Sequence, residues 1–212
     1  DTFTVTLNDG STTTVTITAT GTDDAPVVSS GTGAVTEDTS PTATGTLTAT
    51  DADNPTLAFV ADTQSGAYGS LTLNAAGAWT YTLGAAAQAL AGGQVVADTF
   101  TITLNDGSTT TISITATGTD DAPVISSGTG TVTEDTSPTA TGTLTATDAD
   151  NPALAFVAGA QSGAYGSLSL NAAGAWTYTL GAAAQALTGG QVVTDTFTVT
   201  LNDGSTTTVT IT

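Results

Sequence analysis

Apolar and polar residues alternate with a period of two along most of this chain. Within 98–105, for example, Phe100, Ile102 and Leu104 alternate with polar residues, most of which are threonines. Such a period places one set of side chains on each face of a β-strand, and threonine suits the face that meets solvent. Between residues 27 and 117 the pattern predicts seven strands, which span 27–36, 43–50, 57–61, 70–74, 78–83, 98–105 and 110–117. We therefore expect an all-β fold, a seven-stranded antiparallel β-sandwich.

Turn residues separate the predicted strands. The segment Asn105-Asp106-Gly107 is a strong hairpin signal, and Asn74-Ala75-Ala76-Gly77 is a second turn. The segment 85–90, followed by Gly92-Gly93, is typical of one or two helical turns that end at a glycine. These turns agree with the strand boundaries that the alternation predicts.

The sequence repeats itself with an offset of 97 residues. When residues 26–115 are laid over 123–212, only 11 of the 90 positions differ, and residues 1–18 are identical to 195–212. A period of this length suits one immunoglobulin-like sandwich per repeat rather than the rung of a solenoid. We predict the last two strands and linker of a preceding repeat over 1–22, a first full repeat over 23–119 and a second over 120–212.

The two strands predicted within residues 1–18 have no partner sheet in their own part of the chain. An isolated two-stranded hairpin is only marginally stable in water. If this hairpin is ordered, we expect another chain or a neighbouring fragment to complete it, for example in a filament.

The charge of the chain is entirely negative. Its 212 residues include 19 aspartates and glutamates but no Lys, Arg, His, Cys or Met, so the formal net charge is −19. Nucleic-acid binding is excluded because phosphate neutralisation needs Lys or Arg, and contact with anionic lipid fails for the same reason. No apolar stretch is long enough to insert into a membrane. Because 39% of the residues are hydrophobic, the chain has a core to bury, and its carboxylates need positive charge from outside, most simply from metal ions.

The predicted strand directions place the acidic residues at the two ends of each sandwich. At the end where the chain enters the first repeat lie the incoming linker, the loop after strand 43–50 and the hairpin turn. These three segments carry Asp23, Asp24, Asp51, Asp53 and Asp106. At the opposite end lie the turn after strand 27–36, the start of strand 98–105 and the next linker.

We therefore expect the joint between the two repeats to gather eight carboxylates, namely Glu37, Asp38, Asp98, Asp120, Asp121, Asp148, Asp150 and Asp203. Calcium takes six to eight oxygen ligands in a flexible geometry and fits such a set, whereas magnesium keeps its waters and demands a stricter octahedron. Zinc is unsuited without His or Cys. The alternative is that these acids only form turns and keep the protein soluble, since Asp favours turns. That alternative does not explain why the acids crowd the ends that meet.

Five motifs recur in the repeats: Thr119-Asp120-Asp121-Ala122-Pro123-Val124, Leu144-Thr145-Ala146-Thr147-Asp148-Ala149-Asp150, Tyr165-Gly166-Ser167-Leu168, Trp176-Thr177-Tyr178-Thr179-Leu180 and Asp195-Thr196-Phe197-Thr198-Val199. In combination, these motifs resemble VCBS repeats, which are bacterial repeats of about this length found in giant RTX-type surface adhesins. The resemblance covers the whole chain. It implies export by type I secretion and a role in adhesion and biofilm formation.

The acidic motifs are also similar to those of cadherins, so the repeats resemble bacterial cadherin-like domains. In cadherins an acidic linker ending near Ala-Pro, an Asp-x-Asp loop of the next domain and a Glu of the previous domain share calcium. The resemblance assigns these roles to Asp120 and Asp121, to Asp148 and Asp150, and to Glu37. The chain lacks the full Asn-Asp-Asn linker and the Leu-Asp-Arg-Glu motif of cadherins.

Three classes of function follow from these observations. The first is an extracellular structural spacer of a bacterial surface adhesin or filament, stiffened by Ca²⁺ and partnered by neighbouring repeats or by other copies. The second is a module that binds a glycan or another surface ligand through its loops, Tyr68 among them, or through its threonine-rich faces. The third, an enzyme, lacks the residues that most nucleophilic and acid–base schemes need. Paired carboxylates could hydrolyse glycosides, but here they lie at joints and recur in every copy.

Overall fold

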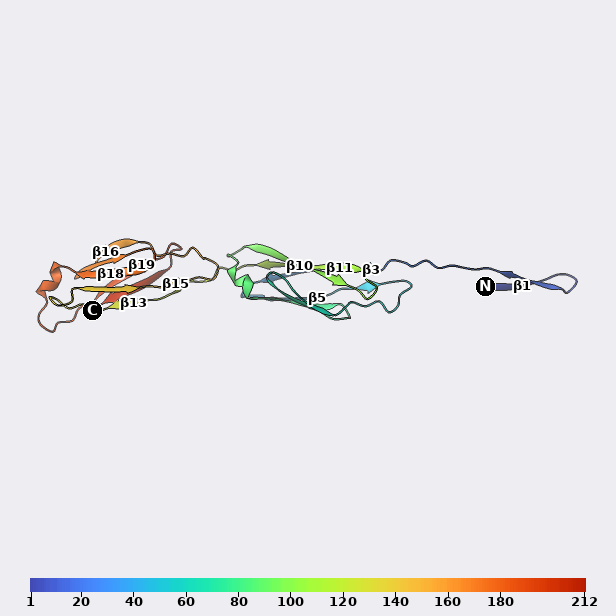
Figure 1. Cartoon of the computed structure of the whole chain (residues 1–212), viewed down its shortest axis with the longest axis horizontal. Coiled ribbons are helices and arrows are strands. Elements are labelled where there is room, and N and C mark those ends of the chain that lie inside the picture. Colours follow the sequence, from blue (N-terminus) through green and yellow to red (C-terminus); the bar gives the residue numbers. More distant parts are fainter.

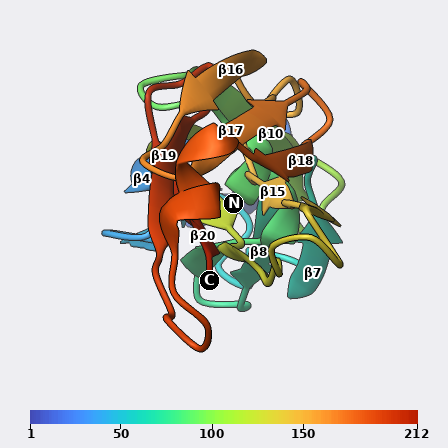
Figure 2. The same ribbon diagram turned by 90° about the vertical axis from the view of Figure 1, so that its left-hand side faces the viewer.

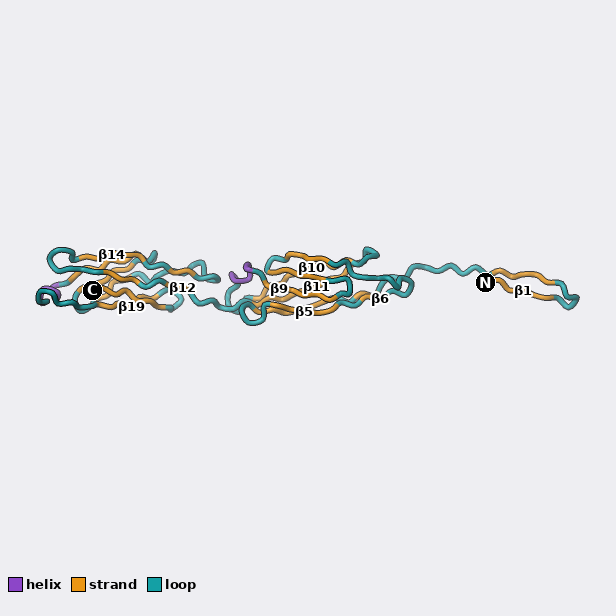
Figure 3. Tube along the Cα trace, turned by 90° about the horizontal axis from the view of Figure 1, so that it is seen from below, coloured by secondary structure: helices purple, strands orange, loops and turns teal.

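The computed structural model describes all 212 residues and shows an elongated chain of three parts (Figure 1). A hairpin of β1 (Thr2–Thr6) and β2 (Thr12–Thr16) is followed by two β-sandwich repeats in tandem. Extended linkers join the three parts (Figure 3). No helix of the structure has the length and apolar character that a membrane crossing requires.

The two repeats contain the same succession of elements. The first repeat consists of β3 (Val27–Val28), β4 (Gly31–Thr36), β5 (Thr42–Thr46), β6 (Ala49–Thr50), β7 (Asp62–Ser65), β8 (Gly69–Leu73), β9 (Ala78–Leu83), the 3₁₀ helix η1 (Ala85–Ala89), β10 (Val95–Thr103) and β11 (Thr109–Thr117). The second consists of β12 (Val124–Ile125), β13 (Gly128–Gly130), β14 (Thr139–Thr143), β15 (Ala146–Thr147), β16 (Gly159–Ser162), β17 (Gly166–Leu170), β18 (Ala175–Leu180), η2 (Ala182–Ala186), β19 (Asp195–Thr200) and β20 (Thr206–Ile211). The all-β sandwich expected from the alternation is confirmed.

Each sandwich is built from two main sheets. In the first repeat a four-stranded sheet has the order β5-β9-β8-β7, a three-stranded sheet has the order β10-β11-β4, and β3 pairs with β6. All pairs are antiparallel except β4 and β11, which are parallel. The parallel pair corrects the expectation of a uniformly antiparallel sandwich. It arises because the strand predicted over 27–36 is divided, with β3 pairing with β6 and β4 pairing with β11.

The strand predicted over 57–61 does not form as expected. Phe59 makes only an isolated bridge to Leu104, and the strand that pairs with β8 is β7, Asp62–Ser65. The side chain of Phe59 is buried in the core, so the apolar segment marks a packing contact rather than a sheet ladder. In contrast, β7 is mostly exposed and polar, which left no alternation in the sequence to reveal it.

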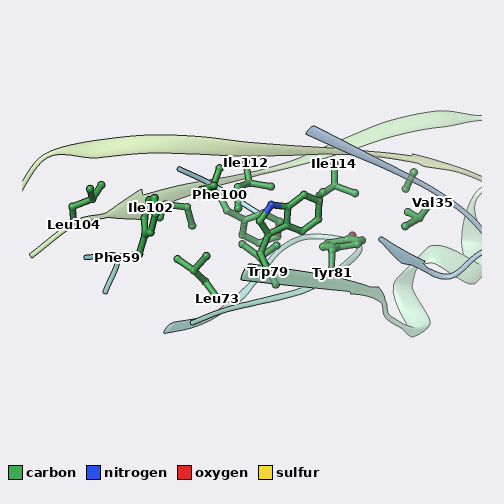
Figure 4. Packing of buried hydrophobic residues seen from close by; sticks show 13 residues of the cluster. Val35, Phe59, Leu73, Trp79, Tyr81, Phe100, Ile102, Leu104, Ile112 and Ile114 are labelled. Carbon is green, nitrogen blue, oxygen red and sulfur yellow. The ribbon is translucent and has the colours of Figure 1, made fainter. Parts of the chain in front are cut away.

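The core of the first repeat lies between its two main sheets. Trp79 and Tyr81 of β9 face Ile112 and Ile114 of β11, and all four are buried (Figure 4). The full cluster comprises Val35, Leu47, Phe59, Leu71, Leu73, Trp79, Tyr81, Phe100, Ile102, Leu104, Ile112, Ile114 and Ala116. The threonines between these positions are mostly exposed, as the period of two predicts. A matching cluster fills the second repeat.

Close approach of the backbone to Trp79 explains a glycine in the middle of β5. Gly45 pairs with Trp79 across the sheet, and a Cβ built on Gly45 would lie 2.5 Å from Cζ2 of the indole. No side chain fits there unless the ring moves. Glycine is otherwise unfavourable inside a strand, so its presence here reflects packing of the indole against the backbone.

The two repeats are stacked end to end. Figure 2 looks along the long axis from the second repeat and shows the strands of the two sandwiches one behind the other. The end of the first repeat at which β11 leaves therefore faces the end of the second repeat that receives the linker. The chemistry of this joint is set by the residues at these two ends.

We predict that Gly45→Ala lowers the free energy of unfolding of the first repeat by about 1–3 kcal/mol, the usual cost of overpacking a core. Chemical denaturation monitored by tryptophan fluorescence measures this change. Gly84→Ala is the matched control, because a Cβ there would make an ordinary contact of 3.5 Å with the Tyr68 carbonyl oxygen. Equal stability of both variants and the parent would contradict the packing account.

Candidate metal centre

The joint begins where the linker after β11 meets the turn after β4. The Glu37 amide donates to the Thr117 carbonyl oxygen at 3.0 Å. The Thr119 amide donates back to Glu37 Oε2 at 3.1 Å, and the Thr119 hydroxyl donates to Asp38 Oδ2 at 3.0 Å. Asp38 adopts a positive φ of 57°, which reverses the chain so that both acidic residues of the turn reach the linker.

A second segment, the loop after η1, holds the linker from the other side. The Gly93 amide donates to the Gly118 carbonyl oxygen at 2.9 Å, and the Gly118 amide donates to the Gln94 carbonyl oxygen at 2.9 Å. A Cβ on Gly92 would lie 3.1 Å from the Asp120 backbone nitrogen, and one on Gly118 would lie 2.6 Å from the Leu90 carbonyl oxygen. Both glycines therefore permit the contact that fixes Asp120 and Asp121 at the end of the first repeat.

Two carboxylate oxygens of the joint are buried without a hydrogen-bond partner. They are Oε1 of Glu37, a residue that is only 1% exposed, and Oδ2 of Asp121. A buried carboxylate oxygen without a partner is costly, because it has lost water and gained nothing in return. No Lys, Arg or His exists in the chain to compensate it. These oxygens are suited to ligate a cation that the polypeptide does not supply.

The repeats provide an internal comparison, because the same acidic residues occur away from the joint. Glu37 is buried at the joint, whereas its counterpart Glu134 is only partly buried. Asp121 is partly buried, whereas Asp24, its counterpart in the linker after the lone hairpin, is exposed. These carboxylates are therefore withdrawn from water where a linker leaves a full repeat, rather than by the fold of every repeat.

The loop after β15 contributes the pair expected from the second repeat. The Asp150 amide donates to Asp148 Oδ1 at 3.2 Å. A side-chain hydrogen bond shared with Asp150 raises the pKa of Asp148, as expected when two carboxylates lie side by side. Asp150 is partly buried, whereas its counterpart Asp53 is exposed.

The equivalent loop after β6 in the first repeat shows how the linker and this pair meet. The Asp24 amide donates to Asp53 Oδ2 at 3.0 Å, and the Asp53 amide donates to Asp51 Oδ1 at 3.1 Å. The side-chain hydrogen bond with Asp53 raises the pKa of Asp51, while the Asp24 amide lowers the pKa of Asp53. The linker and the Asp-x-Asp loop thus lie together at this end of the first repeat. The other linker acid, Asp23, is exposed and makes no side-chain hydrogen bond.

Asp106 and Asp203 lie in the β10–β11 and β19–β20 hairpin turns. In each turn the aspartate Oδ1 accepts hydrogen bonds from the amide and the hydroxyl of the serine two residues later, Ser108 or Ser205. These bonds, that of the hydroxyl above all, lower the pKa of each aspartate. The neighbouring Asn202 bonds to the Ala153 carbonyl oxygen, which keeps this turn beside the loop that follows Asp150. Even so, no three acidic side chains converge in a metal-binding arrangement, so the structure pairs the carboxylates without assembling the full predicted set.

Asp98, which we expected among the acids of the joint, makes its hydrogen bonds within the first repeat. The carboxylate is 5% exposed and accepts hydrogen bonds from the Ala67, Tyr68 and Gly69 amides and from the Tyr81 hydroxyl, the last at 2.8 Å. Strand β10 begins at Val95 rather than at Asp98, which moves Asp98 inward along the strand. Its side chain therefore ties the β7–β8 turn to β10.

Sequence reasoning missed Tyr81 as a partner of Asp98. Burial raises the pKa of the Tyr81 phenol, and the hydrogen bond to Asp98 raises it further. The only available signal was that both residues recur in the second repeat, where the Tyr178 hydroxyl donates to Asp195 at 2.7 Å. That signal does not reveal a contact between two positions 17 residues apart.

The chain belongs to the family of bacterial cadherin-like domains, whose sequence model matches residues 23–118 and 120–212. No curated protein matches the sequence. Among solved structures, the chain is similar to the protocadherin GammaB4 extracellular domain, with 18% identity, a TM-score of 0.42 and coverage of 95% of this chain and 37% of that one. It is also similar to Drosophila N-cadherin EC1-4, with 14% identity, a TM-score of 0.44 and coverage of 89% and 49%.

A third similar structure is mouse cadherin-23 EC22-24, with 19% identity, a TM-score of 0.43 and coverage of 89% of this chain and 66% of that one. The chain thus spans from about a third to about two thirds of the length of these structures. Family membership and the all-β tandem fold are consistent with an extracellular module of adhesion or structure.

We predict that Asp98→Asn destabilises the first repeat by about 3 kcal/mol, because an amide nitrogen cannot accept the bonds made by the buried donors. Tyr81→Phe removes only one of these bonds and should cost about 1 kcal/mol. Urea denaturation measures both changes. Calcium affinity, measured by titration calorimetry, should be the same in Asp98→Asn as in the parent, and a marked loss would place Asp98 back among the metal ligands.

Proposed function

We propose that this chain is part of an extracellular spacer of a bacterial adhesin or surface filament, in which calcium at the joints stiffens the array of repeats and so supports adhesion or biofilm formation. The observation that carries the proposal is the pair of buried, unpartnered carboxylate oxygens at the joint, Glu37 Oε1 and Asp121 Oδ2. A spacer needs its joints to resist bending, and these atoms lie where the two repeats meet.

The charge of the joint supports a requirement for a cation. The linker acids Asp120 and Asp121 directly follow Thr119, whose amide and hydroxyl donate to Glu37 and Asp38. No side chain of opposite charge exists in the chain. Like charges brought together in a partly desolvated place repel one another, and breaking the contact relieves this repulsion. Without a bound cation the joint is therefore expected to loosen.

The chemistry of the donors favours calcium over other metal ions. All available ligands are carboxylate, amide and carbonyl oxygens, which are the ligands of calcium and magnesium, while zinc prefers nitrogen and sulfur. The donors come from a turn, a linker and a loop rather than from one rigid element. Calcium tolerates such an irregular set, whereas magnesium demands a near-ideal octahedron.

The residues proposed to hold calcium come from both repeats. The first repeat supplies Glu37 and Asp38, the linker supplies Asp120 and Asp121, and the second repeat supplies Asp148, Asp150 and Asp203. Two or three bound calcium ions would neutralise most of the charge on these carboxylates and connect the two domains electrostatically. The polypeptide itself positions the linker, because the hydrogen bonds from Thr119 to Glu37 and Asp38 hold it against the turn after β4. The equivalent set at the start of the first repeat is Asp23, Asp24, Asp51, Asp53 and Asp106.

Near-identity of the repeats agrees with a spacer. Only 11 of 90 aligned positions differ, and most of the changed residues are similar in size or polarity. A site that recognises one ligand needs to be present once, whereas the length of a rod depends on the number of copies. In this proposal, reach is set by repeat number and stiffness is set by the joint.

We predict that calcium stabilises and straightens this chain. At a free calcium concentration of about 100 times the dissociation constant, linkage adds about 2.7 kcal/mol to the free energy of unfolding. Calorimetry should therefore show a higher melting temperature in calcium than in chelator. Small-angle scattering should show a longer and more uniform particle. The same melting temperature and the same scattering curve in both conditions would contradict the proposal.

We also predict that Glu37→Gln weakens calcium binding roughly tenfold or more, since calcium affinity depends on the number of charged ligands. Glu134→Gln is the matched control, because Glu134 occupies the same place in the second repeat but is only partly buried and has no buried oxygen without a partner. Titration calorimetry of the two variants compares the sites directly. If both substitutions lowered the affinity equally, the joint would have no special role.

A further inference from the structure

Strand β5 forms one edge of the four-stranded sheet in the first repeat, and its only partner in that sheet is β9. The Leu83 amide donates to the Pro41 carbonyl oxygen at the start of this ladder, so the odd-numbered residues of the strand bond to β9. Bonded and non-bonded pairs alternate along an antiparallel ladder. The amides and carbonyl oxygens of Thr42, Thr44 and Thr46 therefore point away from β9.

No other segment of the chain satisfies these outward backbone groups. The hydrogen bonds made by loops, turns and side chains include none to an amide or carbonyl oxygen of Thr42, Thr44 or Thr46, and all three residues are exposed. The same edge is covered only further along, where Ser29 bonds to Thr48 and β3 pairs with β6. The chain thus covers one half of this edge and leaves the other half free.

Two other edges of the first repeat are protected. On β7 the Asp62 carboxylate accepts a hydrogen bond from the outward amide of Thr63 at 2.7 Å, and a charge at a sheet edge discourages further pairing. On β10 the outward carbonyl oxygen of Thr101 accepts a hydrogen bond from the side-chain amide of Gln64 at 2.9 Å. Strand β5 has no such protection, because its sequence Thr-Ala-Thr-Gly-Thr contains neither a charge nor a proline.

We propose that the open edge of β5 docks on β5 of a second copy of this chain, with the two strands antiparallel and Thr44 at the centre of the pairing. Thr44 of one copy lies opposite Thr44 of the other, and Thr42 lies opposite Thr46. The same alternate residues face outward in both strands, so each outward amide meets an outward carbonyl oxygen. The four-stranded sheets of the two copies join into one continuous sheet.

The shape of the edge favours a second copy over an unrelated strand. The free segment lies between Pro41 on one side and the β3–β6 pair on the other, so a partner strand of the same five residues fills it without meeting β3. Pairing places threonine opposite threonine on the solvent face, and such cross-strand pairs stabilise a sheet. On the inner face only Ala43 and Gly45 approach the partner, and neither is bulky.

The distribution of charge also favours this contact. The chain carries a net charge of −19, so two copies repel wherever their acidic ends meet. The five residues of β5 are uncharged, and they place no carboxylate within the new ladder. Two copies are therefore able to approach at this edge without direct contact between acids.

The second repeat presents the same edge. Strand β14, Thr139–Thr143, has the same five residues, and its ladder with β18 begins with the equivalent bond from the Leu180 amide to the Pro138 carbonyl oxygen. Each chain thus has two such edges. A ladder of five residues is short, and a single contact of this size belongs to the weak, transient class. The inference goes beyond the proposed function, because it concerns contacts between copies rather than the stiffness of one, and it does not rest on calcium at the joint.

Disulfide cross-linking of the full chain tests the pairing. The Cα atoms of a hydrogen-bonded antiparallel pair are about 5.5 Å apart, which lies within the range that a disulfide spans. Thr44→Cys chains should therefore form a disulfide dimer under mild oxidation, and the chain has no other cysteine. Thr80→Cys is the matched control, because Thr80 is exposed and lies beside Thr44 on β9, one strand away from the edge. Equal dimer formation by both variants would overturn the proposal.

The register gives a second test. Thr42→Cys chains should not form a dimer alone, because residue 42 of each copy lies at opposite ends of the pairing. Mixed with Thr46→Cys chains, they should form the mixed dimer. If Thr42→Cys chains dimerised alone as readily as in the mixture, the antiparallel register centred on Thr44 would be wrong.

An exchange of charge separates pairing from a loss of folding. Thr42→Asp with Thr46→Asp, added to the Thr44→Cys chain, places aspartates opposite one another and should abolish the dimer. A mixture of these chains with Thr44→Cys chains that carry Thr42→Lys and Thr46→Lys should restore it. The same charged pairs carrying Thr80→Cys instead should not cross-link. Residues 42 and 46 are exposed, so the core is unchanged, and failure of the Asp–Lys mixture to cross-link would overturn the proposal.

Each assay is performed in calcium and again in chelator, in both cases at high salt, which screens repulsion between the acidic chains. Formation of the Thr44→Cys dimer in either condition supports the pairing. Its absence in both overturns the pairing but leaves the proposed function intact, because the calcium dependence of melting belongs to the joint within one chain.

Discussion

Carboxylate groups without any cationic side chain are the constraint on which this structure depends. The protein satisfies most of its exposed aspartates with local hydroxyl and amide donors, as in the turns of Asp106 and Asp203. It satisfies the buried Asp98 with three amides and a phenol. Only at the joint do buried carboxylate oxygens lack a donor. The distinction separates acids that the donors of one repeat satisfy from the two acids at the joint that keep an oxygen without a partner.

Duplication makes this distinction visible within one molecule. The side chain of Glu37 is buried and that of Glu134 only partly buried, although the two repeats share nearly the same sequence. The difference follows from the linker, because residues 117–119 pack against the turn after β4 and hydrogen-bond to Glu37 and Asp38.

The distribution of polar groups fits such an array. The long faces of the sandwiches carry threonine and serine, which hydrogen-bond to water without charge, and the acids are concentrated at the ends of the repeats. Repulsion is thus strongest along the axis, at the places where a bound cation would reverse it. Inside the core, the backbone at Gly45 packs directly against the indole of Trp79.

The sequence alone determined the repeat, the all-β class and the four strands β8–β11, because alternation of apolar residues and threonine encodes which face of a strand is buried, and because the turns between them carry strong local signals. It also predicted that the linker and the Asp-x-Asp loop meet at one end of the domain. Only the tertiary structure decided that β4 lies parallel to β11, that polar β7 forms the sheet edge, and that Asp98 turns inward to Tyr81. Those features depend on contacts between residues far apart in the chain, and so does the burial of Glu37, which no local pattern records.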